Sequence, residues 1–157
     1  MQDDLITAIQ QGNAPRVAEL LDADRTLLGA RAGNVSAVLL AVYYQHPEIA
    51  RLFVERGADV NAVAENAQRV APVHAAASVG DVETMRLLLD RGADPNARQH
   101  NSFVPLHAAA GNGDLDMARL LVARGADRHA RTDDGKDAAA IAAERGRGEF
   151  VSWLNGL

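Results

Sequence analysis

The sequence contains no cysteine. Disulfide bonds, thiolate metal ligands and a cysteine nucleophile are therefore excluded, and the core must be held by packing alone. Long apolar stretches are also missing: no run approaches the roughly 18 residues of a membrane-spanning helix. The N-terminus, Met1 to Leu5, has neither the basic region nor the apolar region of a secretory signal. Together these absences favour a reducing, cytoplasmic location.

Positive charge and catalytic motifs are in short supply too. The net charge is -5 with both signs interspersed, so the basic stripe that nucleic acid or an anionic membrane requires is missing. Lysine is scarce while alanine and arginine are abundant, which is typical of a GC-rich bacterial genome. There is no His-Glu-x-x-His, no Gly-x-Ser-x-Gly and no phosphate-binding loop that ends in Lys-Ser or Lys-Thr. We expect no catalytic residue, no cofactor, no nucleic-acid partner and no membrane partner.

Internal repetition dominates what is present. The segment that begins at Ala71, APVHAAASVGDVETMRLLLDRGADPNA, recurs at Val104 as VPLHAAAGNGDLDMARLLVARGADRHA, an offset of 33 residues. A weaker copy begins at Ser36, and partial copies begin near Asp3 and Asp137. A fixed period of this length is the signature of a stacked repeat protein. We therefore expect five units in a single domain over residues 1–157, and we call these five starting residues the register points.

Each unit is predicted to contain two helices. In the third unit, Pro72 suits the first turn of an alanine-rich helix, and Gly80 suits its left-handed C-terminal cap. Asp81 is then the expected N-cap of a second helix with apolar periodicity, which Gly92 ends. A lone hairpin of this size buries too little apolar surface to fold, so the units are expected to stack. The fourth unit has the same arrangement at Pro105, Gly113, Asp114 and Gly125.

The motif at residues 71–77, its copy at 104–110, and the Gly-Ala-Asp sequences at 57–59, 92–94 and 125–127 resemble the ankyrin repeat. The resemblance covers nearly the whole chain. It implies an all-α fold, a solenoid of five stacked helix-turn-helix repeats with short β-hairpin tips. It also implies a concave face for protein partners, formed by the tips and the first helices. Three full repeats are expected at 31–65, 66–98 and 99–131, between an N-terminal cap at 1–30 and a C-terminal cap at 132–157.

Several positions depart from the ankyrin pattern. The usual threonine before proline is replaced by Ala71 and Val104, which removes the hydroxyl that normally pairs with the motif histidine. In the second unit, Gln45 stands where a glycine normally ends the first helix. Two extra residues lengthen the connection at 63–70, where we expect an irregular or bulged hairpin. Trp153 is expected to lie partly exposed in the C-terminal cap, an interpretation that we favour over a role as an anchor for a partner.

The repeated histidines and aspartates are candidate metal ligands. Paired histidines such as His74 and His107 can bind zinc, but equivalent residues of adjacent helix layers lie about 8–10 Å apart and do not converge on one ion. We favour structural hydrogen bonds for both. Asp59, Asp94 and Asp127 each follow a helix-ending glycine and are expected to accept backbone donors in a turn rather than to bind calcium. The other histidines are expected to be solvated: His46, His100 and His129.

The seventh and eighth residues after each register point are predicted to form the exposed ends of the first helices. This recognition row consists of Gln10, Gln11, Tyr43, Tyr44, Ser78, Val79, Gly111, Asn112, Glu144 and Arg145. It holds both tyrosines of the chain, a residue type enriched at the energetic centres of interfaces. The hairpin tips add polar side chains and Phe103. The predicted protein-binding residues are Tyr43, Tyr44, Arg69, Ser78, Val79, His100, Phe103 and Asn112.

Alternatives remain open for these residues and for the function. A tyrosine that packs within its own unit, or a Phe103 that pins its hairpin to the next, would be structural instead. Our leading hypothesis is a non-catalytic, monomeric adaptor or inhibitor that docks an unidentified protein partner on the concave face of units two to four. The alternatives are an enzyme or metal-dependent protein that uses the motif histidines, and a substrate. For the latter, Asn61 and Asn96 occupy the position that some ankyrin proteins present to an asparagine hydroxylase.

Overall fold

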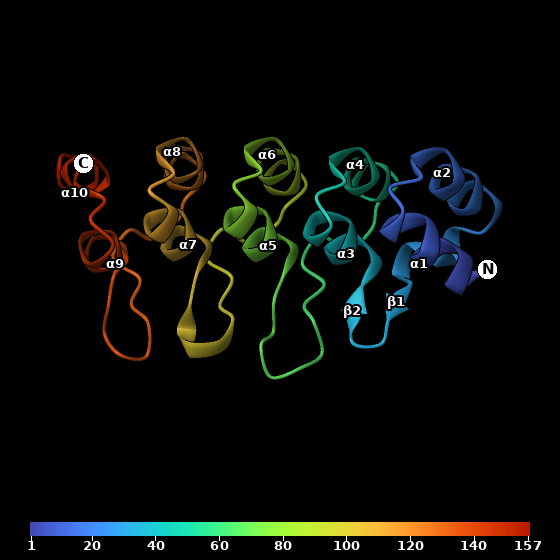
Figure 1. The fold of residues 1–157 in the computed structure, drawn as a ribbon, viewed down its shortest axis with the longest axis horizontal. Coiled ribbons are helices and arrows are strands. Elements are labelled where there is room, and N and C mark those ends of the chain that lie inside the picture. The colour runs from blue at the N-terminus through green and yellow to red at the C-terminus, as the bar shows by residue number, and fades with distance from the viewer.

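The computed structural model describes residues 1–157, and its ten α-helices form five successive pairs in a row. Figure 1 shows two layers, one of first helices and one of second helices, with the chain termini at opposite ends of the row. The first helices are α1 (Gln2–Gln10), α3 (Ala37–Tyr43), α5 (Pro72–Val79), α7 (Pro105–Asn112) and α9 (Ala138–Glu144). The second helices are α2 (Ala14–Ala23), α4 (Pro47–Glu55), α6 (Val82–Asp90), α8 (Leu115–Ala123) and α10 (Gly148–Asn155). The expected all-α solenoid is confirmed.

The predicted helix boundaries follow from local chemistry. The carboxylate of Asp81 accepts a hydrogen bond from the backbone N–H of Thr84 at 3.0 Å, and Asp114 does the same for Met117. Such caps satisfy donors that the first turn of a helix leaves free. At the other end, Gly80 has a left-handed φ of 74°, which ends α5. The caps predicted from the sequence are confirmed at both ends.

A single apolar core runs through the whole row. It contains 41 buried residues contributed by all five helix pairs. Ala76 and Ala109 are fully buried, and their small side chains let α5 pack against α3 and α7, and α7 against α9.

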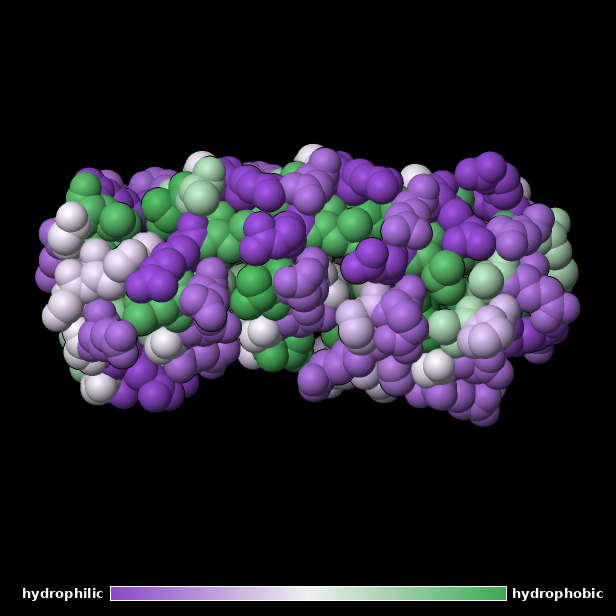
Figure 2. Space-filling view, turned by 90° about the horizontal axis from the view of Figure 1, so that it is seen from above, coloured by the Kyte–Doolittle hydropathy of each residue, from purple (hydrophilic) through white to green (hydrophobic).

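None of the helices combines the length and the apolar character needed to cross a bilayer. The second helices face upward in Figure 1, and Figure 2 shows that this face mixes hydrophilic side chains with smaller hydrophobic areas.

The connections between pairs are less regular than the resemblance implied. Only the first forms paired strands, β1 (Arg31–Ala32) and β2 (Val35–Ser36), in antiparallel register. In the connection at 63–70 the backbone N–H of Ala64 donates to the Val70 carbonyl at 2.8 Å, and that of Arg69 donates to the Asn66 carbonyl at 3.2 Å. Arg69 there has a left-handed φ of 52°, which interrupts a strand ladder. The expected irregular hairpin is confirmed.

Asparagine side chains cross-link neighbouring pairs. Asn61 donates from Nδ2 to the carbonyl of Gly92 at 3.0 Å and accepts from the Asp94 N–H at 2.9 Å. Asn96 makes the equivalent two bonds to the next unit. Each amide is thus engaged both as donor and as acceptor, and a modifying enzyme would have to break these bonds or act around them.

The C-terminal pair closes one end of the core. Phe150 of α10 is 1% exposed, and its ring contacts the half-buried Trp153 in an edge-to-face arrangement with centroids 5.6 Å apart. Trp153 is therefore partly exposed, as expected, and packs as part of the closing helix.

Candidate protein-binding face

The tips of successive connections lie next to one another and form one edge of a continuous face. The backbone N–H of His100 donates to the Gln68 carbonyl, and that of Asp133 donates to the Asn101 carbonyl, each at 3.0 Å. These bonds join the tips of three consecutive connections. Together with the exposed side of the first helices, the tips form the candidate binding face, which we call the tip face.

Exposed apolar side chains concentrate on the recognition row. Tyr43 is 66% exposed, Tyr44 40% and Val79 37%, and the only other large exposed hydrophobic residues are the chain ends, Met1 and Leu157. The two tyrosine rings contact each other edge to face with centroids 5.6 Å apart. Neither tyrosine is buried within its own unit, although the two rings pack on each other. Their role in binding stays a prediction.

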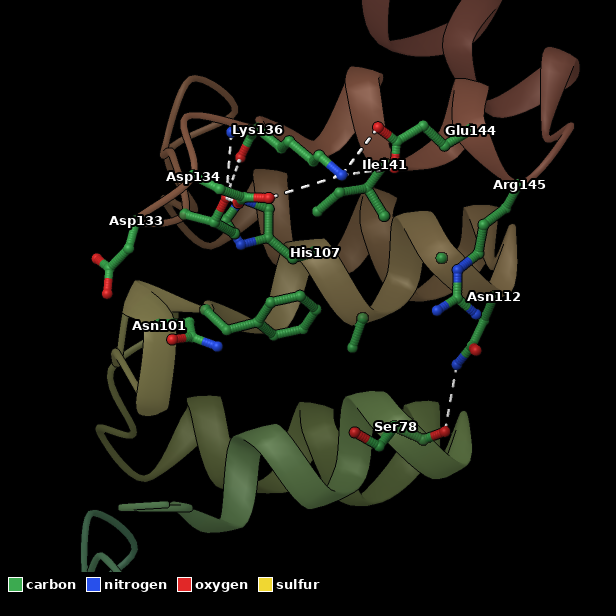
Figure 3. Close-up of a pocket in the computed structure, with 14 residues that line it drawn as sticks. Ser78, Asn101, His107, Asn112, Asp133, Asp134, Lys136, Ile141, Glu144 and Arg145 are labelled. Carbon is green, nitrogen blue, oxygen red and sulfur yellow. Dashed lines mark hydrogen bonds and ion pairs between the residues drawn. The ribbon is translucent and has the colours of Figure 1, made fainter. Parts of the chain in front are cut away.

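A groove of about 770 Å³ opens farther along the tip face, between α5, α7, α9 and the neighbouring tips (Figure 3). Its apolar lining consists of Phe103, Ala108 and Ile141. Asn101 and Asp133 lie at the end nearest the tips, and Ser78, Asn112 and Arg145 lie at the opposite end. The groove therefore combines an apolar part with different polar groups at its two ends.

Phe103 combines structural and surface roles. Its ring packs against the imidazole of His107, in the same unit, with centroids 5.1 Å apart and planes tilted by 57°. The side chain is only half-buried, and the rest of it lines the groove. The aromatic contact of Phe103 therefore lies within its own unit.

The predicted binding residues separate into two areas. Ser78, Phe103 and Asn112 line the groove, whereas the tyrosine pair and Val79 form an exposed ridge outside it. The two predicted tip residues, Arg69 and His100, are also exposed and also lie outside the groove.

One member of the recognition row is not exposed. Gly111 is buried, and a side chain at this position would meet the guanidinium of Arg145 at 3.6 Å. The expectation that Gly111 lies at the surface is wrong because Arg145, from the following unit, covers it.

Sequence reasoning missed Ile141, Asn101 and Asp133 as groove residues. Ile141 stands four residues after its register point, where the two preceding units have Ala75 and Ala108. A comparison of that position across the units would have singled out this larger side chain. Nothing in the repeat pattern singles out Asn101 or Asp133, because tips differ from unit to unit.

The motif histidines hold backbone groups. Nδ1 of His74 accepts from the Ala71 N–H at 2.9 Å, and its Nε2 lies 2.7 Å from the Ala97 carbonyl, which only accepts. The ring is therefore neutral with its proton on Nε2. His107 is held in the same way between Val104 and the Ala130 carbonyl. Burial lowers the pKa of both imidazoles below the ordinary value. The structural interpretation is confirmed, and backbone N–H groups take the place of the missing hydroxyls.

The repeated aspartates and the remaining histidines follow the expectations with one exception. Asp59, Asp94 and Asp127 each accept from the backbone N–H two residues later, at 2.8–2.9 Å. No group of three potential ligand side chains that could hold a metal ion occurs in the structure. His46, expected to be solvated, is instead half-buried, because its ring packs over Gly12 of the preceding unit. His100 and His129 are exposed.

A row of helix pairs with one continuous core and an open face of successive tips defines the class of helical repeat solenoids. Within that class, the model described as "Ankyrin repeats (3 copies)" matches residues 5–99 and 73–156. The chain belongs to the ankyrin repeat family. No curated protein matches it in a sequence search.

Proposed function

We propose that the chain is a non-catalytic, monomeric module that binds a partner protein through its tip face. Ankyrin repeats are generally protein–protein interaction modules. The observation that carries the proposal for this chain is the placement of its exposed apolar side chains. All three large ones away from the termini, Tyr43, Tyr44 and Val79, lie on the recognition row. Exposed apolar groups gathered in one place mark interaction surfaces, and tyrosine contributes large contact areas at low entropic cost.

The repeat boundaries suggested by the sequence are part of the same proposal. The three middle pairs are taken as full repeats at 31–65, 66–98 and 99–131, and the outer pairs, 1–30 and 132–157, as caps. The burial of Phe150 and the exposure of the acidic residues of α1 support the cap assignment.

The test compares the proteins captured from a lysate of the native host by two purified variants. The first carries Tyr43→Ala and Tyr44→Ala. The matched control is Arg86→Ala, an exposed residue of α6 on the opposite layer. Quantitative mass spectrometry is expected to show specific partners lost at least fivefold with the double variant and retained with the control. Unchanged capture by a double variant that melts like the parent chain would remove the tyrosine pair from the binding site.

A metal-dependent activity of the motif histidines is the rival function. Both ring nitrogens of His74 and of His107 are occupied by backbone groups, so neither is available as a ligand in this fold. Calorimetric titration with zinc is expected to show no tight one-to-one binding. Tight binding that His74→Ala abolishes would overturn the proposal of a purely protein-binding chain.

A further inference from the structure

The side chains that line the groove indicate which chemical groups a partner would place in it. We infer that it binds an extended peptide segment of the partner protein in which one acidic side chain lies within two residues of an apolar side chain. The acidic group lies at Arg145, and the apolar side chain lies between Phe103 and Ile141. This inference rests on the proposed protein-binding function and deepens it.

The guanidinium of Arg145 is the group that we expect to bind a carboxylate of the partner. The groove has one other cation, Lys136, which is already paired with Glu144 at 2.9 Å and with Asp134 at 3.6 Å. Glu144 is the acidic neighbour of Arg145 in the sequence, but its carboxylate is paired with Lys136 and not with Arg145. The exposed Arg145 guanidinium makes no ion pair and no side-chain hydrogen bond within the chain, although it lies over Gly111 at the groove (Figure 3). Its planar set of donors matches a carboxylate best.

The polar groups beside Arg145 suit the backbone of an extended chain. Asn112 donates from Nδ2 to the carbonyls of Ala77 and Ser78 at 3.4 and 3.2 Å, which leaves its Oδ1 as an acceptor. The hydroxyl of Ser78 forms no hydrogen bond within the chain and is able both to donate and to accept. An extended peptide presents N–H and C=O groups to its surroundings, whereas a helix has used them internally. These two side chains therefore favour an extended occupant.

The apolar part of the groove accepts an apolar side chain. The ring of Phe103 and the side chain of Ile141 line it, and both are half-buried. The part of α7 that lines the groove includes two small residues, Ala108 and the buried Gly111, beside His107 and Asn112. Small residues at the floor leave room for the side chain of a partner, and its burial supplies the apolar part of the binding energy.

The acidic side chains that line the groove limit the number of acidic groups that a partner can place there. Asp133 accepts a hydrogen bond from the Ser102 hydroxyl at 2.6 Å and has no cationic partner. Asp134 and Glu144 share the single lysine. A second carboxylate, a phosphate or a nucleic acid would face these acids, and like charges at close range are repelled. The charge pattern thus selects one acidic side chain at the Arg145 end.

The test uses a phage-displayed library of random peptides of about 12 residues, selected on the full chain. Enriched peptides are made synthetically, and their affinities are measured by fluorescence anisotropy for the parent chain, Arg145→Gln, Arg145→Glu and the control Arg86→Glu. Arg86 is exposed and unpaired like Arg145 but lies on α6. Thermal unfolding of each variant shows that the fold is kept.

We expect enrichment of aspartate or glutamate within two residues of an apolar residue. Binding should weaken about fivefold with Arg145→Gln and at least tenfold with Arg145→Glu, and should be unchanged with Arg86→Glu. Changing the acidic residue of the peptide to lysine should weaken binding to the parent chain and restore it with Arg145→Glu.

Two outcomes would overturn the inference. Enriched peptides without an acidic residue, or with equal affinity for Arg145→Glu, would show that Arg145 does not choose the partner. The protein-binding function would survive that result if the tyrosine variant still lost its partners from the lysate. A library that yields no binder at the groove also overturns the inference, and the capture experiment then decides separately on the proposed function.

Discussion

Gln45 is one of four residues other than glycine that have a left-handed backbone conformation. Its φ is 58°, at the position where the third, fourth and fifth pairs have Gly80, Gly113 and Gly146 with φ of 70–74°. The left-handed conformation costs a residue with a Cβ roughly 1–2 kcal/mol. The second unit nevertheless keeps its helix ends, because Ser36 caps α3 by accepting from the Leu39 N–H at 3.3 Å, and Pro47 starts α4.

Replacing Gln45 by glycine should therefore stabilise the chain. Relief of the backbone strain exceeds the extra entropy of glycine in the unfolded chain, so we expect the free energy of unfolding to rise by about 0.5–1 kcal/mol. Urea unfolding followed by circular dichroism measures the change. The reverse substitution Gly80→Gln is the matched control and should lower the free energy of unfolding, also because the Asp114 carboxylate lies 3.3 Å from a Cβ there. Equal stability of all three proteins would contradict the argument.

At the scale of the element, two of the five first helices are anchored to the following connection by histidine. α5 and α7 carry His74 and His107, whereas the equivalent positions of α1, α3 and α9 hold Ile6, Leu39 and Ala140. Both rings are almost fully buried, with 2% and 1% exposed. A second proton on Nδ1 would face the backbone N–H that it now accepts from. These helices therefore depend on neutral imidazoles.

This dependence predicts a stability that falls with acid. Burial lowers the pKa of His74 and His107 in the folded chain, so below about pH 6.5 the unfolded chain takes up protons that the folded chain does not. The contribution of the two histidines to the free energy of unfolding is complete above their pKa in the unfolded chain. It is lost as the pH falls toward their pKa in the folded chain, by at most about 1.4 kcal/mol per histidine and pH unit. We expect urea unfolding at pH 5.5 to show a lower free energy than at pH 7.5.

Two sets of variants identify the source of that pH dependence. Glutamine at His74 and His107 should flatten it, since glutamine does not titrate. Glutamine at the exposed residues His100 and His129 should leave the loss between pH 7.5 and 5.5 in place. An unchanged pH dependence after the first pair of substitutions would assign the effect to other groups.

At the scale of the whole molecule, stability is a sum over units and the interfaces between them. Contacts join each helix to its partner and to the neighbouring pairs, and no connection reaches across the row. Such a stack is expected to lose structure from its ends inward when an end is weakened. The last pair is closed by two buried side chains of α10, Phe150 and Leu154, of which Phe150 is the larger.

Replacing Phe150 by alanine should open this end first. Loss of a buried phenylalanine removes about 3–5 kcal/mol from the packing around it. Hydrogen exchange followed by mass spectrometry should show faster exchange in α9 and α10, with little change in α1 to α4. Trp153→Ala, at a half-buried position of the same helix, is the control and should have a smaller effect. A uniform loss of protection over all ten helices would show that the chain unfolds as one unit.

The helix ends, the stack and the exposed tyrosine pair could be predicted from the sequence alone, because they depend on local chemistry and on residue spacing. The helix ends follow from residues such as Asp114 and Gly113, whose caps involve neighbours within one turn, and the period of 33 residues predicts the stack. The tyrosine pair is exposed as the recognition row predicted, since the face of a helix is set by residue spacing.

The position of the groove and the charged group that is left unpaired in it could be found only in the three-dimensional structure. Its lining comes from three units that are far apart in the sequence, with Ser78, Phe103 and Ile141 among its members. The pairing of Lys136 with Glu144 across eight residues leaves Arg145 free, and Arg145 in turn covers Gly111. Repeat spacing predicts which side chains point toward the tip face. It does not predict which of them neutralise one another, because that depends on distances between side-chain atoms, which the spacing of the repeats does not fix.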